Sequence, residues 1–484
     1  MASQSVRGAS IPIGVDVLGL RQIAPEAGLR GRIASAYAVI SCLAVLALAI
    51  LIPPFQAPDE QQHLFRAYQL SQGQLLGRVQ DGVGGGTIPS SLVELAARFL
   101  GGRALHVASG RTIDPTPLRD SLAALSTPLE PERTEFANFS NTAFYSPADY
   151  VAQSAAIVVG RAAGLGPLGL LYAARVANGL TATLVVALAV YLLPAGGAML
   201  AVFALLPMTV FMFASASADA PMTAAALLFT ALGFRAGARG SFTGGELVAA
   251  AMAGIVFCSL KPVYAPLLLI GLPGVLRSAD RKRFLFAHAA ILTACIGVAG
   301  LWLHFGSSIM VPTLPWVSVP AQTEWIMAHK LVFIWVILHT VRLFATDWAR
   351  EIVGKLGWHN LWVPQYTYVF PLAAAALGLT LPRPRPLRLS LLEFGWLAFL
   401  VASSVFLLLT ALYLTWTGVG NGFVGGGQGR YFMPYLGILA IIVEGALPML
   451  DRWKARIAAG GIVAIMLAQA ILTCNLVAQA WHVL

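Results

Sequence analysis

Eleven long apolar stretches, separated by polar turns and loops, constrain this chain more than any other feature. They lie at about 33–52, 168–193, 197–214, 219–234, 246–261, 263–276, 285–305, 363–380, 391–414, 431–450 and 457–478. A helix needs ~20 apolar residues to cross the hydrocarbon core of a bilayer. The stretches 219–234, 246–261 and 263–276 are shorter, so they predict packed, tilted or broken helices. The sequence therefore predicts an all-α polytopic membrane protein with about 11 transmembrane helices.

Composition excludes an ordinary soluble domain. Hydrophobic residues make up 58% of the 484 residues and charged residues only 11%, whereas a soluble domain has ~25% charged residues. The four cysteines fall inside apolar stretches and form no CxxC pair, so neither a zinc site nor a disulfide framework is predicted. The sequence calls for no certain cofactor.

The placement of Lys and Arg predicts the orientation. Short segments that alternate along the chain hold sixteen basic residues: 1–32, 235–245, 277–284, 381–390 and 451–456. The long segment 53–167 has eight basic and ten acidic residues instead. Basic residues concentrate in cytoplasmic loops, so a cytoplasmic tail, 1–32, is expected to precede a single membrane domain, 33–484. The basic residues of these predicted cytoplasmic segments then account for the net charge of +10. Nucleic acid is therefore not an expected partner.

Two large segments, 53–167 and 306–362, are predicted to lie outside the cytoplasm. Both contain amphipathic stretches, and the second is rich in tryptophan, which favours helices lying in the membrane interface. The stretch 148–164 is an alternative transmembrane helix. Its polar residues and the positive-inside pattern downstream favour an interfacial position.

The first outer segment opens with a group of ionisable residues. Pro58 suits the first turn of a helix, which would place Asp59, His63 and Arg66 on one helix face, with Glu60 nearby. Two carboxylates, an imidazole and a guanidinium then lie just outside the first span. The alternative is structural, because acids at a helix N-terminus complement its dipole and Asp59 could pair with Arg66.

Further candidates lie next to later spans. Asp219 begins one span, Lys261 separates two short ones, and Arg175 lies within another; ionisable residues at membrane depth are expensive and are functional candidates by default. Their structural alternatives are a helix cap for Asp219 and snorkelling for Lys261. Arg430 follows a glycine-rich loop, 418–429, where it could hold a phosphate in a bidentate fork or a lipid headgroup.

Together these residues suggest one outer-face site for an anionic substrate with a lipid tail, such as a sugar on a polyprenyl phosphate. A carboxylate could act as general base towards an acceptor hydroxyl, while Arg430 and Lys261 stabilise the departing phosphate. A divalent metal on Asp59 and Asp219 is a further possibility.

Six ordered motifs resemble those of a family of predicted bacterial multi-spanning membrane proteins of unknown function. They are Pro58-Asp59-Glu60…His63…Arg66-Ala67-Tyr68…Gly73, Asn141…Tyr145-Ser146-Pro147…Tyr150, Leu206-Pro207-Met208-Thr209…Ser215…Ser217…Asp219, Ser259…Lys261-Pro262…Tyr264, Gly354…Gly357-Trp358 and Gln428-Gly429-Arg430-Tyr431…Pro434. That family is considered similar to the GT-C glycosyltransferases. The resemblance departs at Ser146-Pro147-Ala148-Asp149, where two prolines and an apolar pair are expected.

The resemblance implies a GT-C-like bundle in the bacterial cytoplasmic (inner) membrane, with the site on the extracytoplasmic face. It implies transfer of a sugar from a polyprenyl-phosphate donor to a cell-envelope glycan or lipid acceptor. Catalysis would fall to Asp59, Glu60 and Asp219. The substrate-binding residues would be His63, Arg66, Tyr145, Lys261, Tyr264, Gln428, Arg430 and Tyr431. The alternatives are a transporter or flippase of lipid-linked glycans and a non-catalytic polysaccharide-assembly protein.

Overall fold

The computed structural model describes residues 27–100, 121–311, 314–378, 389–446 and 455–481. The expected cytoplasmic tail therefore lies largely outside the described residues. Six described helices are long and apolar enough to cross a membrane: Gly28–Leu51, Pro167–Leu192, Arg281–Ile309, Lys330–Gly354, Leu391–Thr415 and Ile457–Ala480. These helices support the prediction of a helical, polytopic membrane protein, although they are fewer than the eleven predicted spans.

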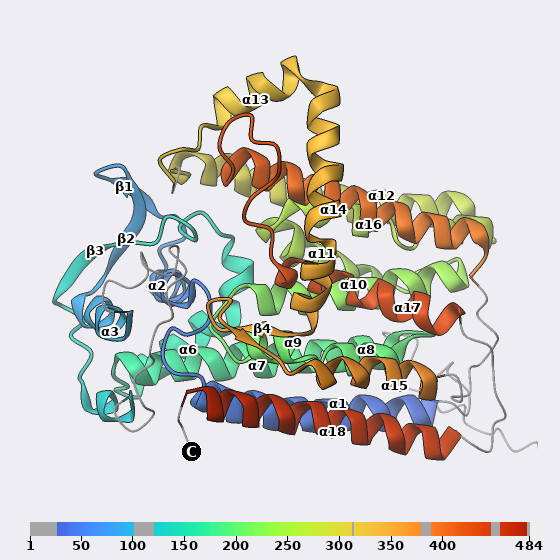
Figure 1. Cartoon of the computed structure of the whole chain (residues 1–484), viewed down its shortest axis with the longest axis horizontal. Helices are drawn as coiled ribbons and strands as arrows, with labels where there is room; N and C mark the ends of the chain where they lie inside the picture. The colour runs from blue at the N-terminus through green and yellow to red at the C-terminus, as the bar shows by residue number, and fades with distance from the viewer. Residues whose placement is uncertain (1–26, 101–120, 312–313, 379–388, 447–454, 482–484) are drawn as a thin grey trace, which may run out of the picture.

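Most of the long helices run side by side in one bundle (Figure 1). Its members are α1 (Ala27–Leu51), α7 (Pro167–Leu192), α10 (Asp219–Arg239), α11 (Gly244–Leu260), α12 (Arg281–Gly306), α16 (Leu391–Thr415) and α18 (Ala455–Ala480). α1 packs between α7 and α18, and α10 packs between α7 and α11. Small side chains permit these close approaches: a Cβ on Gly179 of α7 would meet Val45 of α1 at 2.4 Å.

Several expected spans are broken or short. The stretch 197–214 divides into α8 (Gly197–Phe203) and α9 (Pro207–Phe213), because Pro207 lacks the N–H that would continue the helix. The stretch 263–276 forms two 3₁₀ helices, η4 (Pro262–Leu269) and η5 (Leu272–Leu276), which carry three prolines. α15 (Val369–Gly378) and α17 (Leu436–Ala446) have 10 and 11 residues. Continuous helices therefore support fewer spans than the eleven apolar stretches suggest.

The segment 53–167 folds into helices and a small sheet at one end of the bundle (Figure 1). Its elements are α2 (Glu60–Ser71), β1 (Arg78–Gln80), β2 (Val83–Pro89), α3 (Ser90–Leu100), η2 (Ala123–Ser126), β3 (Thr134–Asn138), η3 (Pro147–Tyr150) and α6 (Val151–Ala162). The antiparallel sheet, in the order β1-β2-β3, was not predicted. Its glycines are required for close pairing, since a Cβ on Gly85 would lie 1.9 Å from the Ala137 carbonyl oxygen. α6 has 12 residues, too few to span, which favours the non-spanning interpretation of 148–164.

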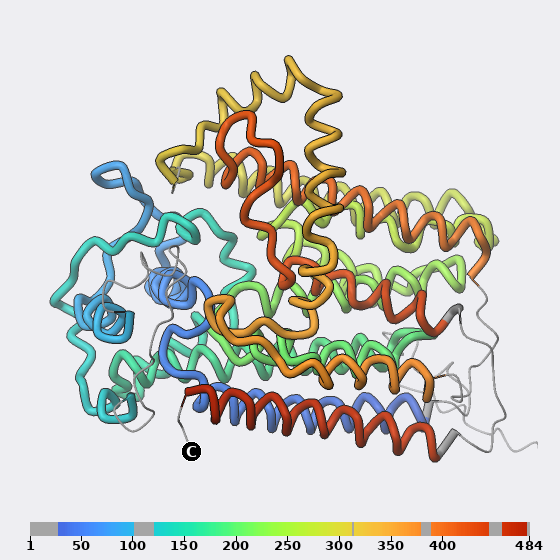
Figure 2. Tube along the Cα trace, in the orientation of Figure 1, coloured from blue at the N-terminus to red at the C-terminus, as the bar shows by residue number. Residues whose placement is uncertain are grey.

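The segment 306–362 crosses the direction of the bundle. Its elements are η6 (Ser307–Ile309), α13 (Val319–Ala328), α14 (Lys330–Gly354), β4 (Lys355–Leu356) and β5 (Leu361–Trp362), followed by η7 (Gln365–Tyr368). Although α14 is long enough to span, Figures 1 and 2 show its axis steeply inclined to the other long helices. This inclination agrees with the expectation that the segment 306–362 contains helices lying in the membrane interface. The C-terminal end of α14 and the β4–β5 hairpin reach the bundle beside η8 (Gly429–Tyr435).

Candidate functional site

Four charged side chains from four distant segments meet in one cluster, which we call the charge cluster: Asp59, Asp219, Lys261 and Arg430. Arg430 Nη2 donates to Asp59 Oδ2 at 3.2 Å across 371 residues of sequence. Arg430 Nη1 lies 3.5 Å from Asp219 Oδ2, and Lys261 Nζ donates to Asp219 Oδ1 at 2.7 Å. The four groups form an unbroken chain of ion pairs.

Local structure positions each member of the charge cluster. Asp59 immediately precedes α2 and has a left-handed backbone with φ of 59°, a conformation that costs energy for a residue other than glycine. Asp219 is the first residue of α10, where its N–H donates to Ser217 Oγ at 3.1 Å. Lys261 ends α11 just before η4, and Arg430 lies in η8.

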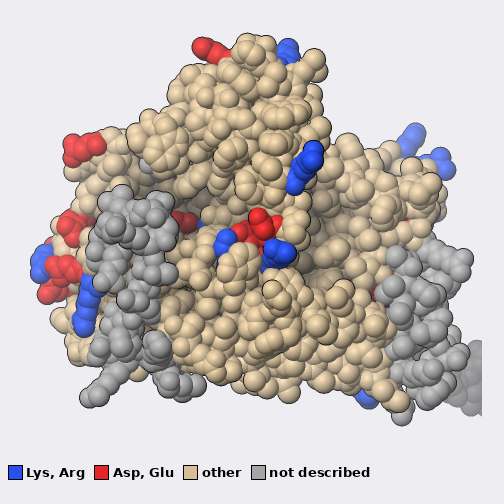
Figure 3. Space-filling model, in the orientation of Figure 1, with Lys and Arg blue, Asp and Glu red and all other residues tan. Residues whose placement is uncertain are grey.

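The members of the charge cluster differ in access to solvent. The Asp59 side chain is 30% exposed, whereas Arg430 and Asp219 are 6% and 7% exposed. The most accessible carboxylate is therefore Asp59, with the guanidinium directly behind it. Acidic and basic side chains gather in a hollow surrounded by uncharged residues, near the point where α14 reaches the bundle (Figure 3).

Aromatic and amide side chains support the two cations. Lys261 Nζ lies 4.6 Å from the ring centroid of Tyr431, and Tyr264 Oη donates to the Tyr431 carbonyl oxygen at 2.7 Å. Arg430 Nε donates to Gln428 Oε1 at 2.6 Å. Cation–π contact and hydrogen bonds to fixed groups preorganise both charges. The structure thus brings together five of the predicted substrate-binding residues, Lys261, Tyr264, Gln428, Arg430 and Tyr431.

His63 lies beside the charge cluster and serves as a neutral link. Its Nδ1 lies 2.7 Å from Tyr150 Oη, and its Nε2 lies 3.5 Å from Ser217 Oγ. Burial lowers the pKa of His63 to about 4, although Asp219 and Asp59 act in the opposite direction. The imidazole is therefore uncharged near neutral pH. Tyr145, another predicted site residue, packs near it with the ring centroids 6.1 Å apart.

Glu60 is fully occupied by a different partner. Glu60 Oε2 and Oε1 accept from Arg175 Nη2 and Nε at 2.6 and 2.8 Å, and both side chains are completely buried. The backbone N–H groups of Phe55 and Ala216 donate to the same carboxylate. Arg175 also donates to three carbonyl oxygens at the end of α1, those of Ala49, Ile52 and Pro53. Both oxygens of Glu60 therefore hold loops in place.

Arg66 does not pair with Asp59, contrary to the structural alternative considered for the sequence. Its guanidinium donates to the carbonyl oxygens of Tyr145 and Leu75 and to Gln69 Oε1. The helix begins at Glu60, two residues after the Pro58 that was expected in its first turn. Arg66 thus ties α2 to two neighbouring loops through these bonds.

A metal held by Asp59 and Asp219 does not fit this arrangement. The guanidinium of Arg430 contacts both carboxylates, and a divalent cation placed between them would meet that fixed positive charge. Within the described ranges, no group of three or more His, Cys, Asp or Glu side chains is arranged to hold a metal. The positive charges beside these two carboxylates are those of Arg430 and Lys261.

The β4–β5 turn and the end of α14 also reach the site, and two of their residues, Glu351 and His359, were not singled out in the sequence analysis. Trp358 Nε1 donates to the Phe55 carbonyl oxygen at 2.9 Å, so the turn is joined to the loop that carries Asp59. Glu351 Oε2 accepts from the N–H of Gly429 at 2.8 Å. His359 has a left-handed backbone, and burial together with the charge of Arg430 lowers its pKa. The Gly354–Trp358 motif was the only sequence signal for this turn.

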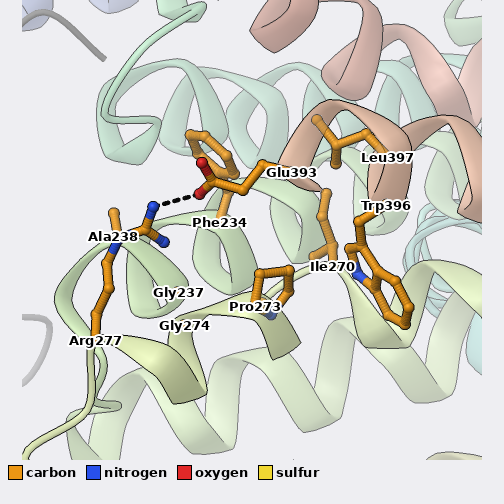
Figure 4. A pocket seen from close by; sticks show the side chains of 11 residues that line it. Phe234, Gly237, Ala238, Ile270, Pro273, Gly274, Arg277, Glu393, Trp396 and Leu397 are labelled. Carbon is orange, nitrogen blue, oxygen red and sulfur yellow. Dashed lines mark hydrogen bonds and ion pairs between the residues drawn. The ribbon is translucent and has the colours of Figure 1, made fainter. Parts of the chain in front are cut away.

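A separate cavity lies towards the other end of α10, between η5 and the start of α16 (Figure 4). It is lined mainly by apolar and glycine residues, including Phe234, Ile270 and Trp396. Its one ion pair joins Arg277 and Glu393 at 2.5 Å. No residue of the charge cluster lines this cavity, so its chemistry differs from that of the candidate site.

The comparisons with known proteins identify a family without assigning an activity. Neither the curated proteins nor the solved structures give a match. One family model, described as "Predicted membrane protein (DUF2142)", matches residues 42–439. This range includes every residue of the charge cluster and most of the bundle, so the chain belongs to the DUF2142 family of predicted membrane proteins.

Proposed function

We propose that this protein is a glycosyltransferase with a GT-C-like bundle of about 11 membrane passages, some of them broken. It transfers a sugar from a polyprenyl-phosphate donor to a cell-envelope glycan or lipid acceptor. The observation that carries the proposal is the meeting of Asp59, Asp219, Lys261 and Arg430 at one end of the bundle. This combination provides a proton acceptor and two cations, as transfer from a lipid phosphate requires.

The distribution of charge supports a site on the extracytoplasmic face of a bacterial inner membrane. Asp219 is the first residue of α10 and Arg239 is the last. At that far end, Gly240 lies against Ser278, so two of the basic turns meet there. With the basic turns in the cytoplasm, the charge cluster faces outwards, beside the sheet-containing segment 53–167.

Each member of the charge cluster has a distinct role in this mechanism. Asp59, the most exposed carboxylate, takes the proton of the acceptor hydroxyl. The oxygen of that hydroxyl forms the new bond to the sugar. The bond between the sugar and the phosphate breaks, and the electron pair leaves with the lipid phosphate. Arg430 and Lys261 stabilise that negative charge, while Asp219 keeps Lys261 in place through their ion pair. Glu60 and Arg66 act as positioning residues, because their bonds go to structural partners.

Arg430 exchanges partners when the donor binds. Its contacts to the two carboxylates are single and fairly long, at 3.2 and 3.5 Å, whereas a phosphate can accept from a guanidinium in a bidentate fork. Asp219 retains Lys261 after such an exchange, and Asp59 is released to act as the base. Donor binding and activation of the base are thereby coupled.

Replacing Arg430 tests the phosphate site directly. Arg430→Gln is expected to weaken binding of farnesyl phosphate by roughly ten- to a hundredfold, since hydrogen bonds to charged groups contribute about 1.5–3 kcal/mol. Binding would be measured by calorimetry on protein in lipid nanodiscs. Arg350→Gln, at an exposed arginine of α14, is the matched control. Equal affinity in both variants would contradict the assignment.

Vesicle assays separate this function from the alternatives. A transferase forms a new glycosidic bond when donor and acceptor are supplied to the purified protein in vesicles. A flippase moves labelled lipid between leaflets without forming that bond, and a non-catalytic assembly protein does neither. Bond formation that depends on Asp59 supports the proposal, and lipid movement without it favours a transporter.

A further inference from the structure

One short segment, residues 351–358, contacts the backbone on two sides of the charge cluster. It comprises the last turn of α14, strand β4 and the turn that follows. Glu351 and Trp358 are not members of the charge cluster, yet each bonds to the backbone next to one of its members. The proposed mechanism requires Asp59 and Arg430 to be placed correctly towards each other, although they lie 371 positions apart in sequence.

Glu351 binds the backbone that carries Arg430. Its Oε2 atom accepts from the buried N–H of Gly429 at 2.8 Å, and its Oε1 atom accepts from Lys355 Nζ at 2.8 Å. The two segments lie so close that only glycine fits at 429. A Cβ there would lie 2.3 Å from the Glu351 Cβ and 2.7 Å from the Ile352 nitrogen. The carboxylate therefore fixes the peptide group that immediately precedes Arg430.

Further contacts attach the neighbouring residues of that loop to α14. The N–H of Val424 donates to Thr340 Oγ1 at 2.9 Å, in a buried position. The rings of Trp348 and Phe432 pack with their centroids 5.2 Å apart. Contacts with α14 thus lie on both sides of Arg430 in the sequence, and Glu351 provides the hydrogen bond nearest to it.

Trp358 binds the turn that leads to Asp59. Its Nε1 donates to the Phe55 carbonyl oxygen at 2.9 Å, across 303 residues of sequence. Phe55 and Asp59 have left-handed backbones, with φ of 63° and 59°. Such a conformation costs energy in residues other than glycine and persists only where the surrounding structure holds it. Here the holding contacts are the bond from Trp358 and the bond from the Phe55 N–H to Glu60 Oε2.

We propose that Glu351 and Trp358 are positioning residues, and that the segment joining them sets the separation of Arg430 and Asp59. Glu351 holds Arg430 where it receives the donor phosphate, and Trp358 holds Asp59 where it reaches the acceptor hydroxyl. The inference rests on the proposed function for the identity of the ligand. It adds an expectation that the charge cluster alone does not give: loss of Glu351 impairs phosphate binding, whereas loss of the Trp358 N–H impairs transfer.

Affinity for farnesyl phosphate tests the role of Glu351, with full-length protein in lipid nanodiscs. Glu351→Ala removes the acceptor of the Gly429 N–H, so a smaller fraction of the protein has Arg430 in its binding position. Because apparent affinity falls with that fraction, we expect binding to be about three- to tenfold weaker, as the loss of one hydrogen bond implies. Glu351→Gln keeps an acceptor oxygen and is expected to bind within about twofold of the unchanged protein.

The matched control for Glu351→Ala is Asp347→Ala, which changes an exposed acid of the same helix and is expected to leave the affinity unchanged. Equal affinity in Glu351→Ala and the unchanged protein would overturn the proposal. Equally weak binding by Glu351→Gln and Glu351→Ala would also overturn it, because the hydrogen bond to Gly429 would then not be the cause.

The maximal rate of transfer tests the role of Trp358. Trp358→Phe keeps an aromatic ring but loses the indole N–H, so the turn before Asp59 is free to shift. We expect the rate to fall roughly ten- to a hundredfold, the effect of misplacing a catalytic group by about 1 Å, with phosphate affinity no weaker than before. Trp335→Phe, at an exposed tryptophan of α14, is the control. A lower thermal midpoint with an unchanged rate would indicate a merely structural role and overturn the proposal.

Hydrogen exchange of the unliganded protein separates failure of this inference from failure of the proposed function. The peptide that contains residues 428–431 is expected to exchange faster in Glu351→Ala, and the peptide that contains residues 55–60 faster in Trp358→Phe, because each loses a local contact. Unchanged exchange in both variants would overturn the inference. If the unchanged protein bound no farnesyl phosphate but the variants showed this exchange pattern, the proposed function would fail and the two positioning contacts would be supported.

Discussion

Asp59→Asn is expected to lower sugar transfer by roughly a hundred- to ten-thousandfold, the range over which general acid–base catalysis contributes. The amide has nearly the same shape but accepts no proton from an acceptor hydroxyl. Because the Asp59 side chain is 30% exposed and its ion pair with Arg430 is long, the free energy of unfolding is expected to fall by about 1 kcal/mol or less. This variant is therefore expected to lose transfer activity while its stability stays nearly unchanged.

The affinity for the donor phosphate is expected to rise in Asp59→Asn, although its transfer activity falls. Asp59 competes with the donor phosphate for Arg430, so Asp59→Asn should bind farnesyl phosphate about two- to fivefold more tightly, as loss of an exposed ion pair of less than about 1 kcal/mol implies. Weaker binding would indicate that Asp59 holds the phosphate through another group, and would contradict the exchange of partners at Arg430.

The matched control for this variant is Asp81→Asn. Asp81 also has a left-handed backbone, with φ of 50°, but it lies in an exposed turn outside the charge cluster. The readouts are glycan composition in cells that carry only the variant gene, and transfer by purified protein. Normal glycan and normal transfer in stable Asp59→Asn protein would remove Asp59 from the catalytic role.

Glu60→Gln is expected to destabilise the protein by roughly 3–5 kcal/mol, the usual effect of leaving one partner of a buried ion pair unpaired. Arg175 would remain fully buried with its three carbonyl contacts but without its counter-charge. The end of α1, the start of α2 and the segment at Ala216 meet at this pair. The measurement is the thermal midpoint and the yield of monodisperse protein in detergent.

The double variant Glu60→Gln with Arg175→Met gives a second test of this structural role. Removing both charges avoids an unpaired buried ion, so part of the stability lost in Glu60→Gln should return. Arg133→Gln, which breaks an exposed ion pair with Glu130, is the control and should cost about 1 kcal/mol or less. A Glu60→Gln protein of normal stability without transfer activity would instead favour a catalytic Glu60.

Much of the outline could be predicted from the sequence, because the relevant signals are local. Apolar length predicts a helical membrane protein, and the alternation of basic segments predicts an orientation. Prolines at 207, 262, 266 and 273 mark the breaks in helices 197–214 and 263–276, although the sheet at β1-β2-β3 was missed. Short strands rich in glycine carry little hydrophobic periodicity, so the hydrophobic pattern of the sequence did not predict them.

The choice of partners within the site was decided only by the tertiary structure. Asp59 and Glu60 are adjacent in sequence, yet one contacts Arg430 and the other is buried with Arg175. Spacing along a helix had suggested Arg66 for Asp59, because such spacing reports only neighbours on the same helix. A contact between residues 371 positions apart depends on how the helices pack. The sequence alone determined which acidic and basic side chains are present. Only the tertiary structure decided which of them form pairs.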